Sequence, residues 1–171
     1  SGGGLSSDSQ YNTVGGTNAG DSFSGTDAEK NTLIGYDAGT SITTADANTF
    51  IGYKTGESCT TGSQNVCIGL EVGKGFTTAF GNIFFGRYAG TTATSCSNTI
   101  AMGYESGYRT TGQHGIYIGA QSGYSATTGN RNTFVGGYAG YTVSTGGFNS
   151  GFGTSAGYLL TTGDNNSFLG A

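Results

Sequence analysis

The chain has 171 residues, of which 35 are glycine and none is proline or tryptophan, and only 9% are charged. Glycine at this level without proline or a Gly-X-Y period excludes collagen, and 34% hydrophobic with 12% aromatic residues is high for a disordered linker. Ten acidic and six basic residues give a net charge of −4, so no cationic surface is available for phosphates and nucleic acid is not an expected partner.

Membrane, metal and cofactor sites are not predicted either. No apolar run approaches the ~20 residues of a membrane helix, and no basic amphipathic helix is present. Three cysteines, Cys59, Cys67 and Cys96, allow at most one intramolecular disulfide, and the sequence leaves their oxidation state open. Their spacing fits no metal motif, and the single histidine, His114, lies in a loop where a solvated side chain is expected.

The first segment in chain order is a Gly/Ser-rich arm, residues 1–11, which lacks the repeat of the remaining chain. A glycine-rich terminus is ordered only when another surface holds it, so we expect the arm to pack on a neighbouring subunit. The residues assigned to this contact are Ser1, Gly2, Gly3, Gly4 and Leu5. A start at Ser1 without a signal peptide fits a processed protein or a fragment of a longer one.

Residues 12–171 form one repetitive domain. The glycine of the pattern N-T-F-I-G-Y-x-A-G recurs ten times and bounds nine coils, seven of them 17 residues long, at Gly16, Gly35, Gly52, Gly69, Gly86, Gly103, Gly119, Gly136, Gly153 and Gly170. Two glycines per repeat among β-branched residues leave no 3.6-residue apolar stripe, which excludes helices. The period therefore predicts an all-β fold, a parallel β-solenoid or β-roll of about nine 17-residue coils.

A short strand is expected just before each of these anchor glycines. The residue directly before the anchor is apolar in every coil but the first, as at Ile34 and Ile51, and a mostly β-branched residue stands two positions earlier, as at Thr32. Strand side chains alternate, so these two columns share one face, which we expect to be the core. The column between them is then expected to form a second core layer or a subunit interface; its members are Leu33, Phe50, Phe84, Tyr117, Phe134 and Phe168.

Two glycine turns and a ladder of asparagines complete the predicted coil. An invariant glycine four residues after the anchor and a T-T-G pattern in the second half of the coil mark the turns. Asparagine opens the strand at positions 12, 31, 48, 65, 82, 98, 132, 149 and 166, with Gly115 as the exception. Stacked about 4.8 Å apart, these amides are expected to bond one another. Lys54 is likewise expected to lie between Asp37 and Glu71 of adjacent coils.

The motif Asn98-Thr-Ile-Ala-Met-Gly103 resembles the N-S-V-A-I-G repeat of trimeric autotransporter adhesin heads. The commoner N-T-F-I-G-Y-x-A-G form resembles repeats of phage tail fibres and secreted bacterial surface-fibre proteins, and the likeness covers residues 12–171. It implies a β-roll outside a cell or virion that serves attachment or fibre extension, with no catalytic residue. The 17-residue period is longer than that of the adhesin heads, so trimerisation does not transfer with the motif.

The last coil stops half-way, without a polar cap, and an open coil end exposes strand edges. We therefore expect another copy of the chain to complete it by strand addition, at Asn166, Phe168, Leu169 and Gly170. The expected function is that of a structural subunit of an extracellular fibre assembled head to tail. A trimeric adhesin or tail-fibre shaft that binds surface carbohydrate is the first alternative, and an ice-binding solenoid is the second.

No catalytic residue is predicted, because the carboxylates are scattered singly over turns, and the chain is not expected to be an enzyme. Four tyrosines occupy one column in successive coils and form what we call the tyrosine rail: Tyr108, Tyr124, Tyr141 and Tyr158. The rail is expected to stack structurally or to be buried against a subunit, with stacking on sugars as the alternative. Asn165, in Asn165-Asn166-Ser167, is a candidate for N-glycosylation.

Overall fold

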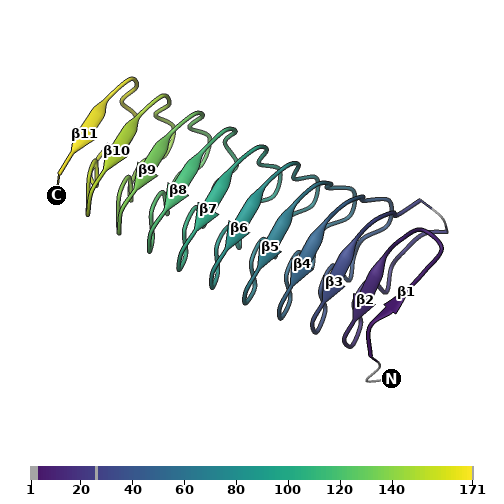
Figure 1. Cartoon of the computed structure of the whole chain (residues 1–171). Helices are drawn as coiled ribbons and strands as arrows, with labels where there is room; N and C mark the ends of the chain where they lie inside the picture. Colours follow the sequence, from purple (N-terminus) through teal and green to yellow (C-terminus); the bar gives the residue numbers. More distant parts are fainter. Residues whose placement is uncertain (1–3, 26, 171) are drawn as a thin grey trace.

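The structure is a computed structural model that describes residues 4–25 and 27–170, so Ser1, Gly2 and Gly3 of the predicted contact lie outside the described residues. A single 11-stranded sheet holds its strands in chain order, side by side along a rod (Figure 1). The strands are β1 (Ser6–Ser7), β2 (Thr13–Gly15), β3 (Thr32–Ile34), β4 (Thr49–Ile51), β5 (Val66–Ile68), β6 (Ile83–Phe85), β7 (Ile100–Met102), β8 (Ile116–Ile118), β9 (Thr133–Val135), β10 (Ser150–Phe152) and β11 (Ser167–Leu169). From β2 onward all neighbours are parallel, which confirms the predicted parallel β-solenoid.

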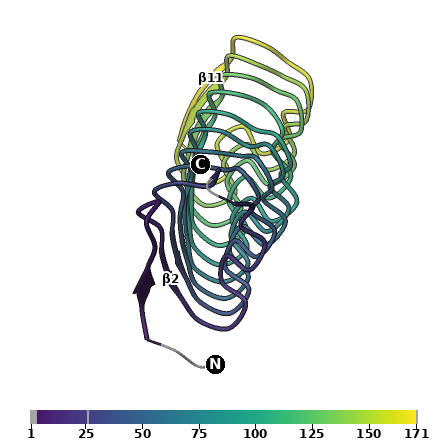
Figure 2. The same ribbon diagram turned by 90° about the vertical axis from the view of Figure 1, so that its right-hand side faces the viewer.

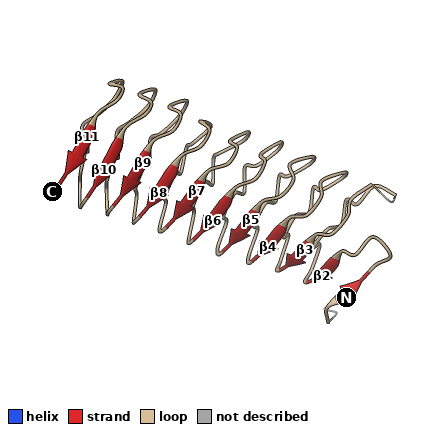
Figure 3. Ribbon diagram, turned by 45° about the horizontal axis from the view of Figure 1, so that its top comes forward, coloured by secondary structure: helices blue, strands red, loops and turns tan. Residues whose placement is uncertain are grey.

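Each coil contributes one three-residue strand, and turns and loops make up the rest of its path (Figure 3). Seen obliquely from the N-terminal end of the rod, the coils follow one another as stacked loops of similar outline (Figure 2). Hydrogen bonds between coils continue far beyond the strands: the Gly56 N–H donates to the Val72 carbonyl at 3.0 Å, and the Thr60 N–H donates to the Thr77 carbonyl at 3.2 Å. Strands this short suffice because the turns are also bonded from coil to coil.

The core lies on the opposite strand face from the one that the sequence pattern suggested. From β3 to β10 the middle residue of the strand is the buried one, and Leu33, Phe50, Phe84, Tyr117 and Phe134 are all 0% exposed. The columns on either side of it, which we expected to be the core, face outward, and Ile83 and Met102 are each 39% exposed. The physical reason is that the buried ladder asparagine stands two positions before the middle residue and so shares its face.

The interior is thin, because small residues face the large middle column. The column three residues after each anchor is buried and mostly small; its buried members are Ala38, Thr55, Val72, Ala89, Ser106, Ser122, Ala139 and Ala156. A third inward column, from the second turn, fills the remaining space with Ile42, Cys59, Phe76, Ala93 and Val143. Phe76 and Phe84 meet edge to face, with ring centroids 5.2 Å apart. The single core is therefore a narrow file of side chains that runs the length of the rod.

The asparagine ladder is present and buried. The Asn48 side chain donates from Nδ2 to Asn31 Oδ1 at 3.2 Å and to the Gly62 carbonyl at 2.9 Å, and its backbone N–H donates to the same Asn31 oxygen at 3.0 Å. Asn65 repeats this pattern on Asn48, with distances of 3.0, 2.8 and 3.0 Å. Each asparagine thus satisfies backbone groups of the turn and also supplies the acceptor for the next coil.

The ladder is broken at two coils, and the assignment of Asn98 to it was wrong. Seventeen residues after Asn82 comes Thr99, which is buried and donates its backbone N–H to Asn82 Oδ1 at 3.0 Å, whereas Asn98 is exposed. The next coil is one residue shorter and places Gly115 in the ladder, where the ring of Tyr117 occupies the space of a side chain. The missing amide is therefore replaced by an aromatic ring in the core.

Tyr117 introduces an unusual polar group into this core. Its hydroxyl and that of Thr110 are both buried and have no hydrogen-bond partner of standard geometry among the described residues. Burial raises the pKa of Tyr117 to about 12, although Thr110 and Asn132 act in the opposite direction. Tyr117 therefore stays a neutral phenol at any physiological pH.

The two glycine columns hold backbone conformations that favour glycine. Gly69, an anchor, has a φ of 136°, and a Cβ there would overlap the carbonyl oxygen of Gly86 in the next coil. Gly73, from the second column, has a φ of 55° and faces the Cys67 sulfur and the Phe76 ring. The invariant glycine of the second column predicts either a positive φ or a close backbone approach; Gly73 has the positive φ, and the anchor Gly69 has both.

Candidate functional site

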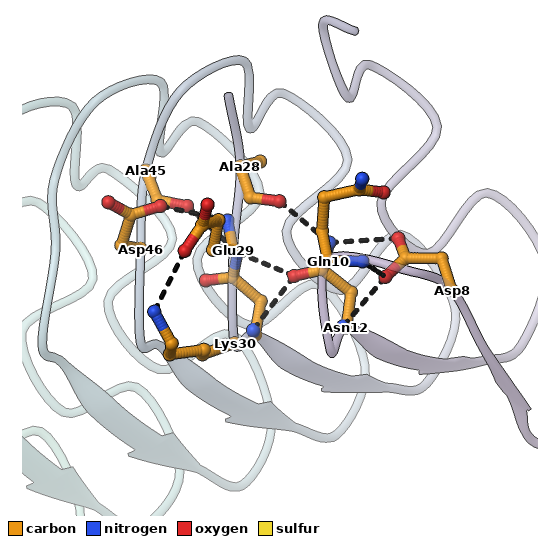
Figure 4. A network of polar contacts seen from close by, with 9 residues as sticks. Asp8, Gln10, Asn12, Ala28, Glu29, Lys30, Ala45 and Asp46 are labelled. Carbon is orange, nitrogen blue, oxygen red and sulfur yellow. Dashed lines mark hydrogen bonds and ion pairs between the residues drawn. The ribbon is translucent and has the colours of Figure 1, made fainter. Parts of the chain in front are cut away.

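The N-terminal end of the sheet is closed by the chain's own arm. Strand β1 pairs antiparallel with β2, with Ser6 opposite Val14. Asp8, which follows β1, points its carboxylate at the first ladder position: Oδ1 accepts the Asn12 backbone N–H at 2.8 Å, and Oδ2 accepts Asn12 Nδ2 at 2.9 Å (Figure 4). Asp8 thus takes the place that the asparagine of a preceding coil would hold. Packing of the arm on a neighbouring subunit remains a prediction.

The charge of Asp8 is stabilised by this arrangement. Partial desolvation acts to raise the pKa of Asp8, but hydrogen bonds from the Asn12 side chain and from the Asn12 and Gln10 backbone outweigh it and lower that pKa overall. A carboxyl group whose pKa is lowered in the folded state stabilises that state above its unfolded pKa, and this contribution is lost as the pH falls through the folded pKa. The cap is therefore expected to loosen below about pH 4.

Replacement of Asp8 with alanine is expected to open the N-terminal coil, because two donors of Asn12 lose their acceptors. Hydrogen exchange at the Gln10 and Asn12 amides should accelerate about tenfold, while amides of β5 keep their protection. Asp8→Asn retains one side-chain oxygen, as in a true ladder position, and should keep most of the protection but lose its dependence on pH. Equal exchange in the alanine variant and the unmodified chain would contradict the capping role.

The outward columns of the strands form a continuous uncharged surface, which we call the outer strip. It comprises the first and third residues of β2 to β11, and none of the twenty is charged. From β5 to β8 all eight are apolar: Val66, Ile68, Ile83, Phe85, Ile100, Met102, Ile116 and Ile118. They are half-buried or exposed, with Ile118 37% exposed. A partly exposed apolar surface of this extent is typical of an interface.

The tyrosine rail is a stack of rings along one edge of the rod. Centroids of Tyr108 and Tyr124, of Tyr124 and Tyr141, and of Tyr141 and Tyr158 are each 5.1 Å apart, with interplanar angles of 11°, 11° and 5°. Tyr138 flanks the stack, 6.0 Å from Tyr141. Because the rings face one another, their edges rather than their faces are left for solvent, which favours structural stacking. Stacking of sugars or burial against a subunit remains a prediction.

Nearer the N-terminus, the same edge of the rod carries an ion-pair network in place of aromatic rings. Lys54 Nζ lies 2.7 Å from Glu57 Oε1 and 3.4 Å from Asp37 Oδ2, and Lys74 Nζ lies 3.1 Å from Glu71 Oε2 and 3.7 Å from Glu57 Oε2. The expected sandwich of Lys54 between Asp37 and Glu71 is therefore half right, because Glu71 pairs with Lys74 instead. The hydrogen bond to Glu57 is the main reason why the pKa of Lys54 lies above its ordinary value.

The residues predicted for assembly lie at the two ends of the sheet. Gly4 is exposed, and Leu5 is 66% exposed although its side chain contacts Gly15. At the C-terminal end of the sheet, Leu169 is 87% exposed and Gly170 is also exposed, whereas Asn166 and Phe168 are half-buried. Asn165 is exposed and has a φ of 58°, so its side chain is accessible. Neither the assembly contacts nor a glycan is tested by this placement.

Converging metal ligands and a membrane-crossing helix are both absent from residues 4–25 and 27–170. No group of three or more His, Cys, Asp or Glu side chains converges there, and no helix there has the length and apolar character needed to cross a membrane. Cys59, Cys67 and Cys96 are free and buried, and burial raises the pKa of Cys59 and of Cys96 to about 12 and that of Cys67 well above its ordinary value. These thiols are therefore inert core side chains.

Sequence reasoning missed two of these features. The sequence pattern predicts a core where the structure has the outer strip, although the Thr and Ser members of the strip in β2–β4 and β9–β11 indicate an outward face. The sequence pattern assigns no role to Asp8 in the arm, although this acidic residue stands four positions before the first ladder asparagine. In comparisons with known proteins, no family model, curated protein or solved structure matches this chain.

Proposed function

We propose that the chain is a structural subunit of an extracellular fibre, in which copies of the rod associate with one another. The outer strip is the observation that carries this proposal, because four consecutive coils present only apolar side chains on the sheet face. A partner that covers the apolar part of the strip without burying an unpaired charge is itself uncharged there, and the same strip of a second copy meets that requirement at the same coil spacing. The extracellular location of the proposed fibre is supported by the resemblance of the repeat to surface-fibre proteins.

The dimensions of the strip agree with association of many copies rather than with one tight pair. The nine spacings between ten strands, at about 4.8 Å each, give a strip about 43 Å long, and two outward side chains per strand make it about 10 Å wide. Two copies face to face would bury roughly 900 Å² in total, which is below the roughly 1,000 Å² that a specific interface between one pair needs. Such contacts become stable when they are repeated along a fibre.

Head-to-tail addition at the coil ends is the second assembly mode that we propose, and the strand pairings at the two ends of the sheet support it. Because β1 already pairs with β2, a strand added at that end of the sheet would meet β1. At the other end it would extend the parallel sheet beyond β11, in the register that β10 and β11 already share. A joint of this kind and lateral packing through the outer strip can coexist in one fibre.

Two lysines on the outer strip are expected to abolish association. The double variant Ile83→Lys and Ile100→Lys puts unpaired charges into the apolar part of the strip and should weaken self-association at least about 100-fold. Sedimentation velocity and negative-stain microscopy of the full chain measure the effect. The matched control, Thr78→Lys and Thr128→Lys, adds the same charge at exposed turn residues and should associate like the unmodified chain. A monomeric unmodified chain at about 100 μM, or equal loss in both variants, would refute the proposal.

A further inference from the structure

We propose that the tyrosine rail is a site of oxidative modification, at which a one-electron oxidant joins tyrosines of successive coils through carbon–carbon bonds. This goes beyond the structural function, because it is a covalent chemistry that the rail would perform whether or not copies associate. Three successive ring pairs have centroids 5.1 Å apart and planes within 11° of parallel. The phenols of adjacent coils are thus held in contact before any reaction begins.

The backbone keeps these rings in register. The Arg109 N–H donates to the Tyr124 carbonyl at 3.3 Å, the Ser125 N–H donates to that of Tyr141 at 3.1 Å, and the Thr142 N–H donates to that of Tyr158 at 3.1 Å. Each rail position is therefore tied to the coil before it by a main-chain bond directly beside the ring. Radical coupling in solution is limited by the encounter of two phenoxyls, and a fixed pair removes that requirement.

The rail is also open to an oxidant from its outer edge. Tyr108, Tyr124 and Tyr141 are half-buried, and Tyr158 is exposed. Burial and the neighbouring rings of Tyr124 and Tyr158 raise the pKa of Tyr141, so this phenol is protonated at neutral pH and its oxidation releases a proton to solvent. Small oxidants can reach these edges, while the stacked faces stay protected by the neighbouring rings.

The reaction balances with hydrogen peroxide as the terminal oxidant and a peroxidase-type haem as the one-electron carrier. Each of two neighbouring phenols loses one electron and one proton and becomes a phenoxyl radical. The two radicals couple at the carbons next to their hydroxyl groups, and each ring then regains its aromatic form when the hydrogen on the coupled carbon moves to oxygen. Hydrogen peroxide takes up the two electrons and two protons and yields two water molecules. The product links two coils and lacks two hydrogen atoms relative to the starting chain.

Such a link would act as an axial staple. Adjacent rail positions are separated by one coil, so each bond would close a loop of one repeat and hold neighbouring coils together even if their hydrogen bonds opened. Tyr36 and Tyr53 form a comparable stacked pair nearer the N-terminus, with centroids 5.4 Å apart and an interplanar angle of 12°. They are expected to couple as well, whereas Tyr11 has no aromatic partner among the described residues and should not.

Two variants with the same number of tyrosines but different adjacency test the proposal. Both carry Tyr138→Phe and Tyr158→Phe; the adjacent variant adds Tyr108→Phe and keeps neighbours Tyr124 and Tyr141, whereas the alternate variant adds Tyr124→Phe. The alternate variant keeps only Tyr108 and Tyr141, which are two coils apart. Phenylalanine preserves ring stacking in both, so the fold is maintained while the coupling site is removed.

The full chain is treated with hydrogen peroxide and a small haem peptide and then digested with trypsin. Cleavage after Arg109 and Arg131 places Tyr108, Tyr124 and Tyr141 in three different peptides, and fragmentation of the linked peptides in the mass spectrometer separates these tyrosines from Tyr88, Tyr104 and Tyr117. We expect rail links to be at least about tenfold more abundant in the adjacent variant than in the alternate one. Equal yields in the two variants, or links that join separate chains only, would overturn the proposal.

Discussion

Replacement of Gly69 with alanine is expected to destabilise the solenoid by at least about 4 kcal/mol. The anchor glycine has a φ of 136°, which an L-residue rarely adopts, and its Cβ would overlap the Gly86 carbonyl oxygen. That oxygen belongs to the backbone of the next coil and cannot move without disturbing the hydrogen bonds on which the stack depends. The loss would remove a large part of the 5–15 kcal/mol that folded domains of this size possess.

Gly170→Ala is the matched control for this prediction. Gly170 belongs to the same column and also has a positive φ, of 102°, but no atom among the described residues lies within 4 Å of its would-be Cβ. Only backbone strain is added there, so the loss should stay at about 1–2 kcal/mol. Urea unfolding monitored by circular dichroism measures both. Similar midpoints for the two variants would show that close approach between coils is unimportant.

Replacement of Asn65 with alanine is expected to cost about 4 kcal/mol. Its Nδ2 donates to the Ala79 carbonyl at 2.8 Å, and its Oδ1 accepts the backbone N–H of Asn82 at 3.1 Å and Asn82 Nδ2 at 2.8 Å. Alanine leaves the carbonyl and the N–H buried without partners, at about 1–3 kcal/mol each, and adds a cavity. The effect should spread to both adjacent coils, which hydrogen exchange at the amides of β4 and β6 would reveal.

The control for the ladder is Asn98→Gly. Asn98 lies directly beside the ladder column but is exposed, and glycine suits its φ of 53°. This variant should unfold within about 0.5 kcal/mol of the unmodified chain. If Asn98→Gly were as harmful as Asn65→Ala, asparagine content rather than ladder position would determine stability.

The period was sufficient to predict the fold, but the core face required one further comparison. Alternation divides a strand into two faces without saying which is buried, and here both contain apolar residues, such as Ile51 on one and Phe50 on the other. The position of the ladder asparagine shows which face is buried. Asn48 is buried, and Phe50, two positions later on the same face, is therefore buried too. Thr49, on the other face with Ile51, is consistent with an outward column.

Other parts of the site carried no signal in the sequence. Two positions per coil besides the glycines have positive φ, for example Lys54 and Gln64, and their varied side chains conceal this shared backbone conformation. The tyrosine rail, in contrast, could be predicted from the repeat alone, because residues at equivalent positions of successive repeats lie next to one another in a solenoid. The ion pair between Lys74 and Glu71 forms within one coil, across a turn. The alignment of repeats shows only which residues stack between coils, so it does not predict this pair.

The break in the asparagine ladder has a consequence for how the rod folds. In a stack of coils, each unit is stabilised mainly by its neighbours, and cooperativity is transmitted through the interfaces between them. The ladder runs without interruption from Asn12 to Asn82 and again from Asn132 to Asn166, while Thr99 and Gly115 separate the two runs. The ladder is thus divided into two blocks of unequal length, and we expect unfolding that starts at either end to meet its weakest junction at the coils of β7 and β8.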